Sequence, residues 1–264
     1  MALLEVEGLT KRFVTRRDIL GRPRESLTAV DDVSFEIGEG ETLGLVGESG
    51  SGKTTTGRLV ARLLHADSGR VILNGTNLLE AKPKQLREAR RDIQFVFQDP
   101  YSSLDPSWVV ADVVAEPLKH YTSMSRRERH DRAGSLLERV GLDARHRLRY
   151  PYEFSGGQRQ RIAIARALAL EPKLIVCDEA VSALDVSTQA AIITLLEDLQ
   201  SDLGVSYLFI SHDLAVVRHV SRRVAVMQTG AIVEVGDAEE LWRAAQHPYT
   251  QALLAAIPRV STVE

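Results

Sequence analysis

The chain has 264 residues, of which 44% are hydrophobic and 26% are charged, and its net charge is −3. The length and composition fit a globular protein with a sizeable core, in one large α/β domain or two small ones. The net charge gives no reason to expect binding to nucleic acid or to an anionic membrane. Its one cysteine, Cys177, excludes an intrachain disulfide framework and a cysteine-held iron–sulfur cluster, and it suits a reducing compartment. The N-terminus lacks a signal-peptide pattern and no run of about 18 apolar residues occurs, so we expect a cytoplasmic protein without a membrane span.

In chain order, the first elements are strands around a glycine-rich loop. Apolar residues that alternate with polar ones indicate strands over 6–13 and 33–37. The Arg-rich polar stretch 15–28 between them is expected to be a loop, either solvated or in contact with lipid headgroups or a partner. A buried strand over 41–46 leads into the glycine-rich loop, and a helix over 53–64 follows it.

After this helix, strand patterns become fewer and helical patterns predominate. Residues 71–75 predict a hairpin strand with a tight Asn-Gly turn, and residues 93–97 predict a buried strand. Strand signals then disappear, and Ser125 with Glu128 forms a capping box that opens an amphipathic helix. We therefore expect an inserted helical subdomain at about 99–166.

The last third of the chain alternates strands with helices. Apolar strands are expected over 174–178, 205–210, 224–227 and 232–235. This alternation predicts a mainly parallel sheet with helices on both faces. A C-terminal segment at about 237–264 completes the single domain expected for 1–264, and Thr250 can cap a short helix there that Pro258 ends.

The glycine-rich loop matches the phosphate-binding pattern G-x-x-x-x-G-K-[ST]. Its glycines allow a tight turn that brings backbone amides close to phosphate oxygens. Lys53 would add a positive charge, Thr54 a hydroxyl ligand for Mg²⁺, and the helix that follows a positive N-terminal end. A flexible Gly/Ser turn is the alternative, which the strand before and the helix after disfavour. The expected nucleotide-binding residues are Gly47, Glu48, Ser49, Gly50, Ser51, Gly52, Lys53, Thr54 and Thr55.

Polar side chains follow three of the buried strands, at the sheet edge where ligands gather in such folds. Asp178 could hold Mg²⁺ and Glu179 could orient and deprotonate an attacking water, although a strand-end pair can also be a solvated rim. Gln98 could bridge Mg²⁺ and that water, or simply cap a loop. His212 could contact the γ-phosphate, or be structural.

A second glycine-rich helix start lies at Ser155, Gly156, Gly157 and Gln158. Exposed backbone amides and the helix dipole make it a further anion site. Either each site binds its own anion, or two chains share one nucleotide between unlike helix ends. Taken alone, the stretch would only indicate a glycine-rich helix start.

The complete set resembles the nucleotide-binding subunit of ABC transporters. In chain order, the motifs are a Walker A loop at Gly47–Thr54, a Q-loop glutamine at Gln98, a signature at Ser155–Gln158, a Walker B strand at Leu174–Asp178 with Glu179, a D-loop at Ser182–Asp185 and an H-loop histidine at His212. The resemblance implies a P-loop NTPase (RecA-like) α/β fold: a mainly parallel sheet with an N-terminal antiparallel β-subdomain and an inserted helical subdomain. It also implies ATP and Mg²⁺ as cofactors, and Phe13 as the aromatic residue that stacks on adenine. Phe154 stands where the commonest signature has Leu, and Ala180 where many relatives have Pro.

Within this family the chain resembles the ATPases of oligopeptide, dipeptide and nickel importers. The similar stretches are Gln98–Pro106, Asp178–Val186 and His247–Leu254. Many peptide-importing relatives continue into a cysteine-containing extension that this sequence lacks, which leaves room for the shorter nickel type.

The resemblance implies an ATP-hydrolysing subunit that energises import, most simply of di- or oligopeptides. It assigns catalytic roles to Lys53, Gln98, Glu179 and His212, and Mg²⁺ to Thr54, Gln98 and Asp178. The implied partners are a second ATPase subunit, identical or different, in a head-to-tail dimer whose signature closes on the other chain's ATP; two permease subunits; and, indirectly, an extracytoplasmic substrate-binding protein. No nucleic-acid partner is expected, and the location is peripheral, at the cytoplasmic face of the membrane. Alternatives are an importer of nickel or another small solute, a soluble ABC ATPase of DNA repair or translation, and a small-molecule kinase.

Overall fold

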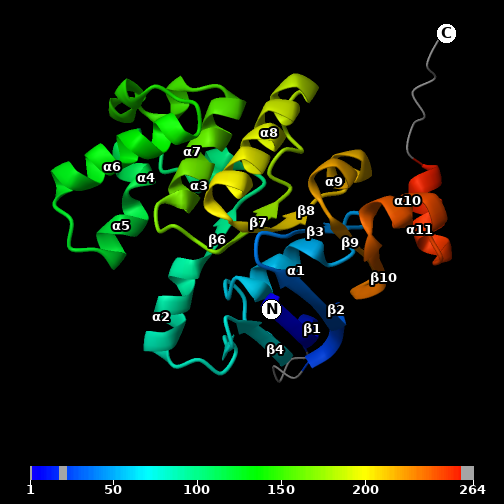
Figure 1. Ribbon diagram of the computed structural model, residues 1–264. Coiled ribbons are helices and arrows are strands. Elements are labelled where there is room, and N and C mark those ends of the chain that lie inside the picture. The colour runs from blue at the N-terminus through cyan, green and yellow to red at the C-terminus, as the bar shows by residue number, and fades with distance from the viewer. Residues whose placement is uncertain (1, 18–22, 257–264) are drawn as a thin grey trace, which may run out of the picture. The chain divides into compact units, whose positions relative to one another are not determined.

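The structure is a computed structural model that describes residues 2–17 and 23–256. The chain divides into two compact units, Met1–Ala81 with Leu208–Glu264 and Lys82–Tyr207, most of whose helices and strands are labelled in Figure 1. The expected single domain at 1–264, with a helical subdomain at about 99–166, stays a prediction.

The N-terminal strands of the first unit form an antiparallel sheet in the order β2-β1-β4-β5. Its strands are β1 (Ala2–Arg17), β2 (Pro23–Gly38), β4 (Ser68–Leu73) and β5 (Thr76–Asn77). The hairpin predicted at 71–75 is confirmed, because β4 and β5 pair antiparallel on either side of Asn74 and Gly75, both at positive φ. Apolar side chains on one face, among them Val6, Val33 and Ile37, are buried in the core.

The prediction of a loop over 15–28 is wrong for most of that stretch. Arg12 pairs with Thr28, Val14 with Ser26 and Arg16 with Glu25, so β1 and β2 continue as a two-stranded ribbon. Opposite charges face each other across this ribbon, with 3.5 Å between the Arg16 and Glu25 side chains. Cross-strand pairing of this kind supports strands that bury no apolar face, which is why hydrophobic patterning missed them. Residues 18–22 lie outside the described residues.

The first unit also holds the strands that flank the glycine-rich loop. The strand β3 (Thr42–Val46), buried throughout, pairs parallel with β9 (Arg223–Gln228), and β10 (Ala231–Asp237) pairs antiparallel with β9. On the other side of β3 lies β8 (Ser206–Ile210), within which the division between the units falls. The helices of this unit are α1 (Lys53–Val60), α9 (Leu214–Val220), α10 (Ala238–Ala244) and α11 (Pro248–Ala255).

Two boundaries in this unit differ from those predicted. The helix expected over 53–64 ends at Val60, and Arg62 then takes a positive φ of 54°. Thr250 does not cap the C-terminal helix: it is buried inside α11, whose N-cap is His247, and the side chain of His247 accepts from the Tyr249 amide. Proline at the first position of α11 fits a helix that begins there. Pro258 lies outside the described residues.

The second unit is mainly helical around two parallel strands. Strand β6 (Ile93–Val96) pairs in register with β7 (Leu174–Asp178). The helices are α2 (Pro83–Asp92), α3 (Pro100–Ser103), α4 (Val110–Val114), α5 (Glu116–Tyr121), α6 (Arg126–Arg139), α7 (Gly156–Leu168) and α8 (Val186–Leu203). The capping box predicted for α6 is confirmed, because Ser125 and Glu128 each bond the other's backbone amide. Over the described parts of the chain, no helix combines the length and the apolar character needed to cross a bilayer.

Candidate functional site

The glycine-rich loop between β3 and α1 can only be built with glycine at two of its positions. Gly47 and Gly52 have φ values of 151° and 108°. A Cβ on Gly47 would lie 2.1 Å from the Met227 carbonyl oxygen, and one on Gly52 would lie 2.3 Å from the Ala29 carbonyl oxygen. Backbone therefore fills the space that a side chain would need, and the loop forms a tight cradle.

Lys53 folds back onto this loop. Its side chain is buried, and its ammonium nitrogen donates to the Gly47 and Glu48 carbonyl oxygens at 2.7 and 2.8 Å and to the Ser51 hydroxyl at 3.4 Å. A buried ammonium needs such partners, because an unpaired charge is strongly unfavourable away from water. The loop thus holds a positive charge at its centre.

The helix that follows the loop begins without a side-chain cap. Gly52 stands at the N-cap of α1 in a left-handed conformation, so no side chain there accepts from the first-turn amides. Such amides are the ordinary binding groups for phosphate oxygens. Thr54 and Thr55 lie half-buried in this first turn, Ser49 and Gly50 are exposed at the tip of the loop, and Ser51 is buried.

A tyrosine from the C-terminal helix reaches the loop. The Tyr249 hydroxyl accepts a hydrogen bond of 3.1 Å from the amide of Glu48, which lies 201 residues away in the chain. In this structure the Glu48 amide, part of the predicted nucleotide-binding set, bonds to protein. No sequence pattern predicts this contact, although Tyr249 lies in the stretch His247–Leu254 that resembles the importer ATPases.

Two further residues of the first unit were predicted to take part. His212 is exposed directly after β8, and its neighbour Asp213 caps α9 by accepting from the amides of Ala215 and Val216. Phe13 lies on β1, 37% exposed, with the Lys11 ammonium 5.6 Å from its ring centre. An exposed ring on a strand is available for stacking, as its predicted role requires.

In the second unit the structure brings two of the predicted residues into contact. Gln98 follows β6 and Glu179 follows β7. The side-chain amide nitrogen of Gln98 donates to the Glu179 carboxylate at 2.8 Å. Asp178, the last residue of β7, is buried. Glu179 has a φ of 49°, a conformation that is strained for glutamate and often found where strain serves function.

The predicted signature stands at the start of α7. Ser155 is its N-cap and accepts from the Gln158 amide, while the Gln158 side chain accepts from the Ser155 amide at 3.0 Å. A Cβ on Gly157 would lie 2.3 Å from a methyl group of Thr188, so α7 begins close against α8. Gln158 therefore orders the helix start, where Ser155 and Gly156 are exposed.

The donor chemistry of these residues fits ATP with Mg²⁺. Backbone amides and a buried ammonium suit phosphate, and the hydroxyl, amide and carboxylate oxygens of Thr54, Gln98 and Asp178 suit Mg²⁺. In the described residues, no group of three or more His, Cys, Asp or Glu could hold a metal alone. The predicted residues divide between the two units, so their union in one site stays a prediction.

Comparison with known proteins places the chain in a family. The ABC transporter family model matches residues 30–182, and the model for the oligopeptide/dipeptide transporter C-terminal region matches residues 233–263. The glutathione import ATP-binding protein GsiA of Escherichia coli is 55% identical over 97% of this chain, and the protein of that name from Shigella sonnei is 54% identical. The chain spans 41% of the length of these relatives.

Solved structures show the same fold over nearly the whole chain. The ATP-binding cassette MJ0796, a dimer bound to ADP and Pi, has a TM-score of 0.78 and 31% identity over 89% of this chain and 98% of its own. The protein cbiO1 from Clostridium perfringens has a TM-score of 0.78 and 26% identity over 92% of this chain and 91% of its own. The fold class predicted from the sequence is thereby confirmed. The chain belongs to the ABC transporter family, and its C-terminal region is similar to that of oligopeptide and dipeptide transporters.

Proposed function

We propose that the chain is the ATP-binding and ATP-hydrolysing subunit of an importer of di- or oligopeptides. The observation that carries the proposal is the glycine cradle of residues 47–52 around the buried ammonium of Lys53. The C-terminal region supports the peptide class, as does the name of the relatives, because glutathione is a tripeptide. Import of nickel or another small solute is the alternative within the same group.

The residues of the first unit would bind and neutralise the nucleotide. Lys53 would exchange its carbonyl partners for the β- and γ-phosphates. The first-turn amides of α1 would donate hydrogen bonds to the phosphate oxygens and so stabilise their remaining negative charge. Phe13 would stack on adenine, and His212 would donate to the γ-phosphate. Thr54, Gln98 and Asp178 would hold Mg²⁺, which would supply stabilisation of the negative charge that develops during phosphoryl transfer.

The residues of the second unit would position the water. Glu179 would act as general base, a role that contributes about 10²- to 10⁴-fold to a rate. In this structure the Gln98 side-chain nitrogen donates to one oxygen of the Glu179 carboxylate, and Gln98 would thereby help to orient that carboxylate.

A second ATPase subunit completes the proposed site. Ser155, Gly156, Gly157 and Gln158 of one chain would bind the nucleotide held by the other chain's phosphate loop, in a head-to-tail dimer. The dimeric MJ0796 cassette is a precedent for such an assembly. The dimer would sit at the cytoplasmic face of the membrane with two permease subunits and, through them, a substrate-binding protein.

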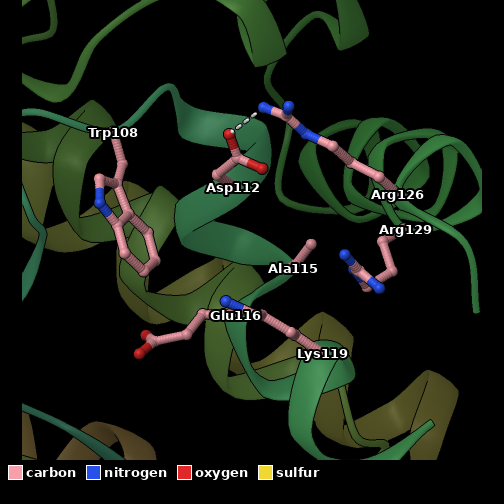
Figure 2. A pocket seen from close by; sticks show the side chains of 7 residues that line it. All are labelled: Trp108, Asp112, Ala115, Glu116, Lys119, Arg126 and Arg129. Atoms are coloured by element: carbon pink, nitrogen blue, oxygen red, sulfur yellow. Dashed lines mark hydrogen bonds and ion pairs between the residues drawn. The ribbon is translucent and has the colours of Figure 1, made fainter. Parts of the chain in front are cut away.

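Two hollows in the second unit suit a permease segment. One hollow has a volume of about 640 Å³ and is lined by Tyr101, Leu104, Pro106, Trp108 and Arg166. Its lining residues from Tyr101 to Trp108 come soon after Gln98 in the sequence. The other, of about 290 Å³, has Trp108 on one wall and the ion pair of Asp112 with Arg126 on another, as Figure 2 shows. Aromatic surface rimmed by charge is typical of protein interfaces.

The variant Glu179→Gln tests the proposed chemistry. It should lower steady-state ATP hydrolysis by about 10²- to 10⁴-fold while ATP binding and ATP-dependent dimerisation persist. Glu88→Gln, which removes the same charge from the exposed face of α2, is the matched control and should hydrolyse ATP normally. Hydrolysis at the control rate would remove Glu179 from the mechanism.

Copurification tests the biological role. Membrane subunits that copurify with the chain and stimulate its ATPase activity would support transport. Stimulation by ribosomes or DNA would instead favour an ABC ATPase without a transport role. Formation of ADP together with a phosphorylated acceptor, in place of released inorganic phosphate, would favour a kinase.

A further inference from the structure

A hydrogen bond joins the C-terminal segment of the first unit to the phosphate loop. The Tyr249 hydroxyl accepts from the Glu48 amide at 3.1 Å, and the neighbouring Glu48 carbonyl oxygen accepts from the Lys53 ammonium at 2.8 Å. Both backbone polar groups of Glu48 are therefore held, one by the C-terminal helix and one by the lysine at the centre of the loop.

The position of Tyr249 is itself fixed by a set of local contacts. The carboxylate of Glu234 on β10 accepts from the amides of Gln246 and His247, at 2.7 and 3.1 Å. The imidazole of His247 then accepts from the Tyr249 amide at 3.2 Å as the cap of α11. A helix of eight residues is marginal alone, so these contacts decide where Tyr249 lies.

We propose that Tyr249 is a positioning residue for the phosphate loop, through which the C-terminal segment sets the affinity for ATP. The inference rests on the proposed function, because it takes the loop to bind ATP. Tyr249 touches the Glu48 backbone and acts through it on the loop that Lys53 spans. The residues that do this, Glu234, His247 and Tyr249, all lie within the region similar to oligopeptide and dipeptide transporters.

The variant Tyr249→Phe removes the hydroxyl and keeps the ring. A net hydrogen bond of ordinary strength corresponds to a factor of about 2 to 12 in an equilibrium. The variant should therefore weaken ATP binding by about 2- to 12-fold and raise KM by a similar factor, while kcat at saturating ATP stays within about twofold. The control is Tyr121→Phe, since the Tyr121 ring keeps its contact with Arg87 without the hydroxyl, and it should bind ATP like the parent chain.

Hydrogen exchange measures how readily the Glu48 amide of the loop opens to solvent in the absence of nucleotide. In Tyr249→Phe the Glu48 amide should exchange about 2- to 12-fold faster, whereas Tyr121→Phe should leave it unchanged. Glu234→Ala frees the turn before α11 and should act in the same direction. Combined with Tyr249→Phe, it should add little, because both changes act through one contact.

The outcomes separate the inference from the proposed function. If Tyr249→Phe lowers only Tm, with parent-like exchange at Glu48 and parent-like ATP affinity, Tyr249 merely fastens the helix and the inference falls. If the parent chain binds no ATP, the proposed function fails and the role in affinity fails with it. Faster exchange at Glu48 together with weaker ATP binding supports the inference.

Discussion

The alanine variants Gly52→Ala and Gly50→Ala test the geometry of the phosphate loop most directly. Both glycines have positive φ, 108° and 80°, and both lie in the same short loop. They differ in the space around them. A Cβ at Gly50 would meet no atom within 4 Å, whereas a Cβ at Gly52 would lie 2.3 Å from the Ala29 carbonyl oxygen and 2.7 Å from the Met227 methyl group.

The expected magnitudes follow from these distances. Alanine at Gly50 has only the backbone strain of a left-handed conformation, about 1–2 kcal/mol, partly offset by about 0.4–1 kcal/mol from the stiffer unfolded chain. Alanine at Gly52 carries strain of about 1–3 kcal/mol and adds overpacking of about 1–3 kcal/mol, because the Ala29 carbonyl belongs to β2 and cannot swing aside like a side chain. We expect a loss of about 1 kcal/mol for Gly50→Ala and, after the same offset, of about 1–5 kcal/mol for Gly52→Ala.

Urea unfolding followed by circular dichroism measures both losses in the absence of nucleotide. Because the chain has two compact units, each resolved transition is fitted separately, and the variants are compared on the same transition. ATP affinity is then measured for each folded variant. Equal destabilisation by the two changes, within about 0.5 kcal/mol, would refute the close approach of the Ala29 carbonyl to Gly52.

Three further predictions concern burial, charge and capping. Burial raises the pKa of the Cys177 thiol to about 12, so iodoacetamide should modify Cys177 only in denaturant, and rapid modification of the folded chain would contradict its burial. Burial acts to raise the pKa of Glu234, but its hydrogen bonds prevail and leave that pKa below the ordinary value of 4.5. The difference in unfolding free energy between the parent chain and Glu234→Gln should therefore be constant above pH 4.5 and should decline as the pH falls through the lowered pKa. Urea unfolding at a series of pH values measures this difference. A difference that grows in acid would mean that the pKa of Glu234 is raised and not lowered. Ser125→Ala should cost about 0.5–2 kcal/mol in urea unfolding by removing the cap of α6, whereas Ser135→Ala within the same helix should cost less, and equal losses would argue against the cap.

The parts of the molecule that were predictable from sequence are those that local chemistry determines. The phosphate loop is predictable because its glycines and lysine stand at fixed spacing between a strand and a helix. The capping box of Ser125 with Glu128 is equally local, since three residues separate its two partners. The tight turn at Asn74 and Gly75, both at positive φ, is a third case.

What escaped prediction depends on contacts between distant parts of the chain. The ribbon formed by residues 12–17 and 23–28 is stabilised by pairing across strands, and the hydrogen bond from Glu48 to Tyr249 spans 201 residues. Thr250 has the ordinary chemistry of an N-cap, yet His247 takes that position because proline follows it at the first turn. The approach of Gln98 to Glu179 was foreseen only as a shared sheet edge, since the hydrogen bond depends on side-chain orientation.

The inward fold of Lys53 has a consequence for how a lysine variant is interpreted. Its ammonium ties Gly47, Glu48 and Ser51 together while the loop is folded, so it serves as an internal cross-link as well as a charge. Truncating it to alanine would remove the lysine donor from the Gly47 and Glu48 carbonyl oxygens, of which that of Glu48 still accepts from the Ser51 amide, and would loosen the cradle before any ligand arrives. A loss of nucleotide affinity in Lys53→Ala would therefore combine a missing charge with a disordered receptor. Lys53→Arg retains the charge on a wider head group, and comparing the two variants would apportion the loss between attraction and rigidity.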